Sequence, residues 1–240
     1  MIGLHFFVLL LLARRRQVLA GLLFSSGLIL GTAHATPHAT TGHGDKQASQ
    51  HLHDWQSLLE HSLQLSDAEK LQAVNAFFNS QIRYGEDQDL WEQSDYWASP
   101  WETLELGAGD CEDFALAKYF TLRLLGISEE RLRLVYTTLS QTQQAHMVLG
   151  YWPKAGGEPV LLDNLDPQIL PLAQRQDLQM QFAFGARHLY RLERSHLLAV
   201  GSIELLPCWQ ALLMKMKHEL LPFAPSLQLA AEGLRLRRNS

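Results

Sequence analysis

The sequence predicts an α+β fold, with helices in the first half of the chain and an antiparallel sheet in the second. Apolar residues recur at helical spacing between residues 55 and 125, and after Gly126 the apolar period changes to two. Helices and strands in separate stretches of one chain favour this class. With 240 residues, 47% hydrophobic and 19% charged, the chain can bury one full core.

Besides one short helix within a loop, three helices are predicted before the sheet. A short one covers residues 55–63, and a longer one begins after Ser66, because Glu69 completes a capping-box pattern, and ends near Tyr84. The acidic, tryptophan-containing stretch up to Gly109 is typical of an ordered loop with one short helix. The third helix, residues 111–125, is apolar around most of its surface, so we expect it to be central.

Five short runs with a period near two predict the strands. Turn-forming residues separate them, and the runs are "RLRLVYTT", "AHMVLGYW", "EPVLLDNL", "QMQFAFG" and "RHLYRLER". A last helix is predicted in "CWQALLMKMKHELL", where Cys208 is expected to be a buried structural cysteine.

The chain divides into four predicted regions. Residues 1–35 hold two apolar runs, three arginines and a small-x-small ending, which indicate a signal peptide, with an uncleaved membrane anchor as the alternative. Residues 36–54 are rich in His, Thr, Gly and Ala and predict a flexible linker. Residues 55–200 form the main domain, and residues 201–240 form the last helix and a basic tail. The formal charge of -5 gives no indication of a nucleic-acid partner.

The stretch "GAGDCEDFALAKYF" places Cys111 at the start of the central helix. The positive end of a helix dipole stabilises a thiolate, which is the form of cysteine that acts as a nucleophile. Three neighbouring carboxylates oppose this, because negative charge disfavours a second negative charge: Asp110, Glu112 and Asp113. Acids in the first turn of a helix are also ordinary capping residues, so helix capping is one interpretation of them.

Two residues that precede Cys111 in the sequence, Gly109 and Trp97, are candidates for contact with a substrate. Gly109 would let a substrate backbone approach closely, since it has no side chain. Trp97 in "DYWASP" either lines a substrate cleft or packs in the core.

A base and its orienting partner are available further along the chain. His146 begins one predicted strand and Asp163 closes the next, so an antiparallel turn can bring the two side chains together. A Cys-His-Asp triad is therefore geometrically sensible. Spacing alone leaves open a buried core cysteine and an unrelated surface histidine.

The residues from about 74 to 172 resemble the LapG-type bacterial transglutaminase-like cysteine proteases. The resemblance is carried by "VNAFFNSQIRYGEDQDLWEQSDYWASPWETLELGAGDCEDFALAKYFTLRLLGI", "AHMVLGYW" and "VLLDNLDPQILPL". It implies a papain-like or transglutaminase-like core and a catalytic triad at the positions Cys111, His146 and Asp163.

The same resemblance implies a cofactor, a substrate and a partner. It places Ca²⁺ ligands on Asp110 and Glu112, with Asp113 as a possible third, and hard oxygen ligands suit this ion. It also implies a periplasmic endopeptidase that cleaves the N-terminal region of a large surface adhesin and so releases cells from biofilm. An inner-membrane receptor of the LapD type, controlled by cyclic di-GMP, would sequester the enzyme.

Two other functions fit the same sequence. Transglutaminase chemistry would use the same acyl-enzyme, with an amine in place of water. A catalytically silent module that only docks the receptor is the alternative outside the enzymes.

Overall fold

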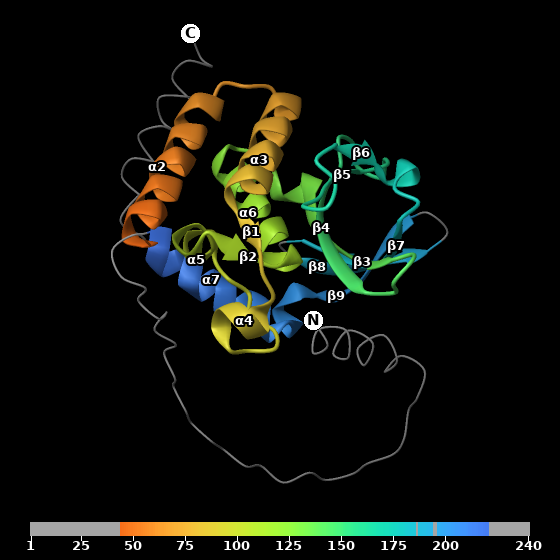
Figure 1. Ribbon diagram of the computed structural model, residues 1–240. Helices are drawn as coiled ribbons and strands as arrows, with labels where there is room; N and C mark the ends of the chain where they lie inside the picture. Colours follow the sequence, from red (N-terminus) through yellow and green to blue (C-terminus); the bar gives the residue numbers. More distant parts are fainter. Residues whose placement is uncertain (1–43, 186, 194–195, 221–240) are drawn as a thin grey trace.

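The computed structural model describes residues 44–185, 187–193 and 196–220 (Figure 1). The predicted signal or anchor segment, the first part of the predicted linker and the basic tail lie outside these residues. In the described part of the chain, no helix has both the length and the apolar character needed to cross a membrane.

Helices gather on one side of the molecule and the seven-stranded sheet on the other, in agreement with the predicted α+β class (Figure 1). The predicted central helix is observed with nearly the predicted bounds, and most of its residues are buried. The helices are α2 (Gly44–Ser62), α3 (Asp67–Gln81), α4 (Asp87–Trp91), α5 (Pro100–Leu106), α6 (Cys111–Leu124) and α7 (Pro207–Leu220).

Helix α2 begins at Gly44, so the prediction of a flexible linker is wrong for residues 44–54. Long-range contacts stabilise this helix. His51 is buried, with its Nδ1 3.0 Å from the carbonyl oxygen of Leu104, and Trp55 donates from Nε1 to Thr121 Oγ1 at 2.9 Å. The linker composition lacks an apolar pattern, but these two side chains dock the helix on α5 and α6.

Helix α3 begins with the predicted capping box, in which the Ser66 hydroxyl accepts from the Glu69 N–H and the Glu69 carboxylate accepts from the Ser66 N–H. It ends at Gln81, earlier than predicted, because the chain becomes extended at Ile82 and forms strand β1 (Arg83–Tyr84). This strand pairs in parallel with β2 (Ala108–Gly109), which leads directly into α6.

The loop between β1 and β2 contains two short helices, α4 and α5, where one was predicted. Helix α5 has its own capping box between Ser99 and Glu102, with Pro100 in its first turn. Gly107 ends it with a left-handed backbone at φ 64°, a conformation that glycine adopts without strain.

The other strands form one antiparallel sheet in the order β6-β5-β4-β3-β7-β8-β9. The five predicted runs are all present, and β6 and β9 are additional strands at its two edges. The bounds are β3 (Leu132–Leu139), β4 (Ala145–Tyr151), β5 (Val160–Leu162), β6 (Leu170–Pro171), β7 (Leu178–Phe184), β8 (His188–Glu193) and β9 (His196–Ser202).

The period of two in the sequence corresponds to two separate cores. Along β3, Leu134 and Tyr136 belong to the large core that also contains α6, whereas Val135 belongs to a smaller core on the opposite face. Strand β4 alternates in the same way, with Leu149 in the large core and Val148 in the small one. Because side chains alternate across a strand, both faces of the sheet are buried here.

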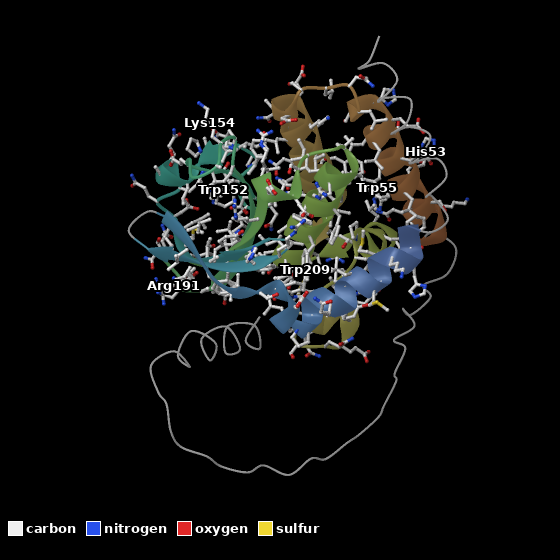
Figure 2. All side chains as sticks on the ribbon, turned by 180° about the vertical axis from the view of Figure 1, so that it is seen from behind. His53, Trp55, Trp152, Lys154, Arg191 and Trp209 are labelled. Atoms are coloured by element: carbon white, nitrogen blue, oxygen red, sulfur yellow. The ribbon has the colours of Figure 1, made fainter. Side chains whose placement is uncertain are left out.

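Helix α7 completes the large core. Trp209, Leu212 and Met216 are all buried in it, and Trp209 stacks on Phe120 at a centroid distance of 5.9 Å. Figure 2, seen from behind, shows α7 across this face with Trp209 labelled near its start. The C-terminal helix therefore packs in the same core as α6. Cys208, beside Trp209, is only half-buried.

Candidate active site and cation site

The predicted pair His146 and Asp163 is in contact. His146 lies near the start of β4 and Asp163 directly follows β5, and these two strands are neighbours in the sheet. The His146 Nε2 atom is 2.8 Å from Asp163 Oδ1, and both residues are buried. Strand pairing therefore produces the geometry expected from the sequence order.

Cys111 is the first residue of α6, and its thiol lies against β4. The backbone N–H of Met147, the residue after His146, donates to Cys111 Sγ at 3.4 Å. The structure thus gathers the three predicted residues where the N-terminus of α6 meets the sheet. The cysteine is only 2% exposed, so the thiol is shielded from water in this state.

Arg175 is a member of the site that the sequence did not predict. Its Nη2 donates to Asp163 Oδ2 at 2.6 Å, and Arg175 is itself buried. Burial raises the pKa of Asp163. The hydrogen bond and charge of His146, the Leu165 N–H and Arg175 together lower it by more, so the resulting pKa is about 2. Asp163 is therefore a carboxylate at neutral pH. The sequence around Arg175, "AQRQD", contains no motif that would have selected it.

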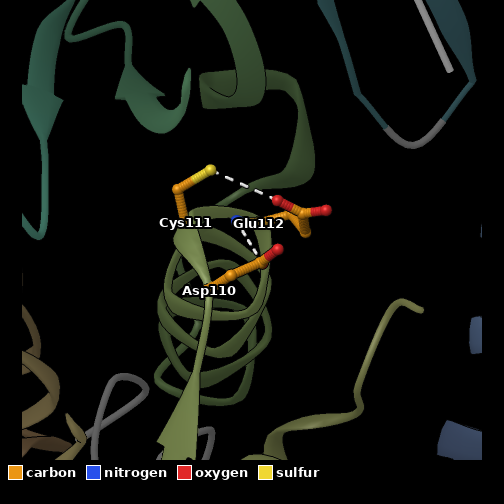
Figure 3. Close-up of side chains that lie close together, drawn as sticks. All are labelled: Asp110, Cys111 and Glu112. Atoms are coloured by element: carbon orange, nitrogen blue, oxygen red, sulfur yellow. Dashed lines mark hydrogen bonds between the residues drawn. The ribbon is translucent and has the colours of Figure 1, made fainter. Parts of the chain in front are cut away.

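Helix capping is a correct interpretation for two of the three acids beside Cys111. Asp110 accepts from the Glu112 N–H at 3.2 Å, and Asp113 accepts from the Asp110 N–H at 3.3 Å. Glu112 does something different, because its Oε2 accepts from the Cys111 thiol at 3.2 Å (Figure 3). This contact favours the protonated thiol.

Two further acids, buried Asp87 and half-buried Asp95, complete a cluster with these three. Asp87 groups with Asp110 and Asp113, and both Asp87 and Asp95 group with Glu112, with ligand atoms within 4.8 Å of one another in each group. The sequence showed crowded acids in "EDQDLWEQSD" but gave no reason to select these two. The chain path through α4 brings them to the N-terminus of α6.

The cluster has the donor set for a hard cation. Glu112 Oε1 and Asp87 Oδ1 are buried oxygens with no hydrogen-bond partner among the described residues. Such orphaned carboxylate oxygens are costly unless something positive faces them. Several oxygens in one compact cluster match the preference of Ca²⁺.

Burial and mutual repulsion change the protonation of the cluster when it holds only its own side chains. Burial, followed by the charge of Glu112, raises the pKa of Asp110 to about 10, and burial raises that of Glu112 to about 7. Burial and then the charges of Glu112 and Asp110 raise the pKa of Cys111 well above its ordinary value. Without an added positive charge, the thiol therefore holds its proton.

The two predicted substrate contacts have packing roles in the structure. Trp97 is buried in the large core and stacks on Phe184 at 5.7 Å, which favours the packing alternative. A Cβ atom at Gly109 would lie 2.7 Å from Asp113 Cβ, so this glycine makes room for the Asp113 side chain.

Comparison with known proteins identifies the family. Residues 32–182 match the family model described as bacterial transglutaminase-like cysteine proteinase. A search of curated proteins finds no match.

Three matching solved structures are of LapG from Legionella pneumophila. The EGTA-treated form is 34% identical, covers 75% of this chain and 100% of its own, and has a TM-score of 0.63. The calcium-bound form is 36% identical, covers 71% and 91%, and has a TM-score of 0.63. A third is 34% identical, covers 75% and 99%, and has a TM-score of 0.62. These matches confirm the predicted transglutaminase-like fold, and the chain therefore belongs to the bacterial transglutaminase-like cysteine proteinases, the LapG-type family that its motifs resemble.

Proposed function

We propose that this protein is a calcium-dependent cysteine endopeptidase that uses Cys111 as nucleophile, His146 as base and Asp163 as the orienting acid. The observation that carries the proposal is the buried His146–Asp163 hydrogen bond beside the strand position that contacts the thiol. With Nε2 directed at Asp163, Nδ1 is the ring nitrogen left to exchange a proton with sulfur.

The proposed reaction is acyl transfer to water. His146 takes the thiol proton, and the sulfur attacks the peptide carbonyl carbon to form a tetrahedral intermediate. The intermediate collapses to a thioester as the C–N bond breaks, and the imidazolium gives its proton to the leaving amine. Water then attacks the thioester while His146 takes a proton from it, and that proton returns to sulfur as the acid product leaves. Asp163, kept ionised beside Arg175, stabilises the imidazolium.

In the same proposal, Asp110, Glu112 and Asp113 hold Ca²⁺, with Asp87 and Asp95 as further ligands. When bound, the ion supplies positive charge that offsets the carboxylates. The charges of Glu112 and Asp110 help to raise the pKa of Cys111, so offsetting these charges would favour the Cys111 thiolate. The calcium-bound and EGTA-treated forms of Legionella LapG support the choice of ion.

We also infer the setting in which the enzyme works. The signal-like segment 1–35 supports export to the periplasm. The resemblance to the LapG-type proteases supports a large surface adhesin as substrate and a cyclic-di-GMP receptor of the LapD type as the inhibitor.

The test is cleavage of a purified adhesin N-terminal fragment in the presence of calcium. Cys111→Ala is expected to abolish cleavage, whereas Cys208→Ala, which removes the other thiol, is expected to retain it. Cleavage by the Cys111→Ala protein would overturn the assignment of the nucleophile.

Two additions to this assay test the cofactor and the reaction type. EGTA is expected to stop cleavage and excess calcium to restore it, and cleavage that is indifferent to EGTA would contradict the metal assignment. A labelled primary amine is expected to stay unincorporated, because water is the acceptor. Efficient incorporation would identify transglutaminase chemistry instead.

A further inference from the structure

We propose that Lys215 on α7 is a positioning residue for the cation site, and that it acts through the extended segment 96–99. The inference rests on the proposed function, because it assumes that the acid cluster binds calcium. It assigns to the C-terminal helix a role in setting calcium affinity, although none of its residues is in the cluster.

The inner edge of the segment orients two carboxylates of the cluster. The Tyr96 N–H donates to Asp87 Oδ2 at 2.6 Å, and the Ala98 N–H donates to Asp113 Oδ1 at 2.9 Å. In an extended chain, N–H groups two residues apart point to the same side. One short stretch of backbone therefore fixes one oxygen of each carboxylate. The other oxygen of Asp87 has no hydrogen-bond partner among the described residues, whereas that of Asp113 accepts from the Asp110 N–H at 3.3 Å.

The outer edge of the same segment is held by α7. The carbonyl of Trp97 accepts from Lys215 Nζ at 2.7 Å, and the Ser99 hydroxyl donates to Glu219 Oε1 at 2.8 Å. Lys215 and Glu219 are four residues apart, so they lie on one face of the helix. Alternate residues of the segment thus face the acids and α7 in turn.

Lys215 has two more partners in this region, and they tie it to the residue that starts the segment. Its Nζ lies 2.7 Å from Glu102 Oε2 and 4.1 Å from the centre of the Tyr96 ring. The Tyr96 hydroxyl donates to Glu102 Oε1 at 2.6 Å. The Lys215 side chain is 28% exposed, so water competes weakly for these contacts.

Loss of Lys215 would remove the donor to Trp97 and the cation beside Glu102 at once. The segment could then shift, and the N–H donors of Tyr96 and Ala98 would shift with it. Mutation of groups that orient metal ligands typically weakens metal binding by 10- to 100-fold. Charge alone predicts the opposite direction, since removing a nearby lysine reduces repulsion of a cation.

The experiment measures the Kd for Ca²⁺ of the full chain by titration calorimetry or competition with a fluorescent chelator. Lys215→Met is expected to raise the Kd about tenfold or more, as for other groups that orient ligands. Lys217→Met, which removes the same charge from an exposed position of the same helix, is the matched control and is expected to leave the Kd unchanged. Lys215→Arg keeps a donor and a charge and is expected to restore most of the affinity.

The outcomes separate this inference from the proposed function. Absence of calcium binding by the unmodified protein would overturn both. Normal binding with an unchanged or lower Kd in Lys215→Met, or an equal rise in Lys217→Met, would overturn only the role of Lys215. If Lys215→Met does not fold, Glu219→Met cuts the other link to the segment and is expected to raise the Kd. An unchanged Kd in that variant would overturn the inference.

Discussion

Lys118 is a fully buried lysine in the central helix α6. Its Nζ has no hydrogen-bond partner among the described residues and lies 5.7 Å from the centre of the Phe114 ring. Burial lowers the pKa of Lys118 to about 7, and the charge of Asp163 only partly opposes this. A buried lysine is tolerated most easily as the neutral amine.

Lys118→Met is therefore expected to stabilise the protein, because it removes an unpaired buried charge while keeping the shape of the side chain. The free energy of unfolding should rise by about 1–3 kcal/mol at pH 7 in urea unfolding. Lys70→Met is the matched control, since Lys70 is also buried but donates to the Leu125 carbonyl at 2.8 Å, and it should destabilise. A loss of stability in both variants would contradict this account.

The same residue predicts a pH dependence. Its pKa is about 7 in the folded state and near its ordinary value of 10.5 when unfolded. Between these values the unfolded chain binds a proton that the folded chain does not, so the Lys118 contribution to stability rises with pH across this window. In Lys118→Met this rise is expected to disappear, as measured by unfolding at several pH values from neutral to alkaline.

For Arg175 we expect the opposite effect on stability, because this buried charge is paired with Asp163 and Asp177. Arg175→Met would leave the buried Asp163 carboxylate without this cation, and the free energy of unfolding is expected to fall by about 3–5 kcal/mol. Arg187→Met is the control, since Arg187 is 75% exposed and pairs with Glu129 on the surface. Equal losses in chemical denaturation would contradict a special role for the buried ion pair.

At this scale the sequence was informative where chemistry is concentrated in short motifs. Cys111, His146 and Asp163 stand at the ends of predicted elements, so their approach could be anticipated. Arg175, Asp87 and Asp95 could not, because their positions depend on how irregular segments fold back on the site. A loop of this kind has no period from which the direction of a side chain can be predicted.

At the scale of elements, the junction between β2 and α6 controls the geometry of the acids. Gly109→Ala would place a Cβ 2.7 Å from Asp113 Cβ, a separation that forces a shift. We expect a loss of about 1–3 kcal/mol in unfolding free energy and weaker calcium binding. Gly157→Ala is the milder comparison, because its nearest atom is the Lys154 oxygen at 3.3 Å in an exposed turn far from the acids, and it should leave calcium binding unchanged. Wild-type calcium affinity in Gly109→Ala would be evidence against this role.

The elements that were predicted well are those stabilised by their own sequence. The capping box of α3 and the alternation of β3 and β4 are local signals, and both appear in the structure. Residues 44–54 of α2 depend on tertiary contacts of His51 and Trp55, which no local pattern encodes. Its start was therefore predicted eleven residues too late.

At the scale of the whole molecule, calcium is expected to stabilise the fold. A ligand that binds only the folded state adds about 2.7 kcal/mol at 100 times its Kd. The increase in Tm on adding calcium to EGTA-treated protein, measured by calorimetry, checks this. No change in Tm at saturating calcium would contradict the cation site.

This calcium-dependent increase should grow as the pH rises. Without the ion, the pKa values of Glu112 and Asp110 are raised to about 7 and about 10, so their contribution to stability is full below about pH 4 and is lost as the pH rises through these values. Calcium prefers the ionised carboxylates and competes with their protons. The Tm increase at pH 8 is therefore expected to exceed that at pH 5, and the difference should shrink in Asp110→Asn.

The position of α7 in the core also has a consequence for biosynthesis. Segments that build the site span Asp87 to Arg175, but the helix that covers the core and holds residues 96–99 ends at Leu220. A ribosome delivers the chain from its N-terminus, so Cys111, His146, Asp163 and the acid cluster all emerge before α7 has been made. The contacts of α7 with residues 97 and 99 can therefore form only after synthesis has passed Glu219.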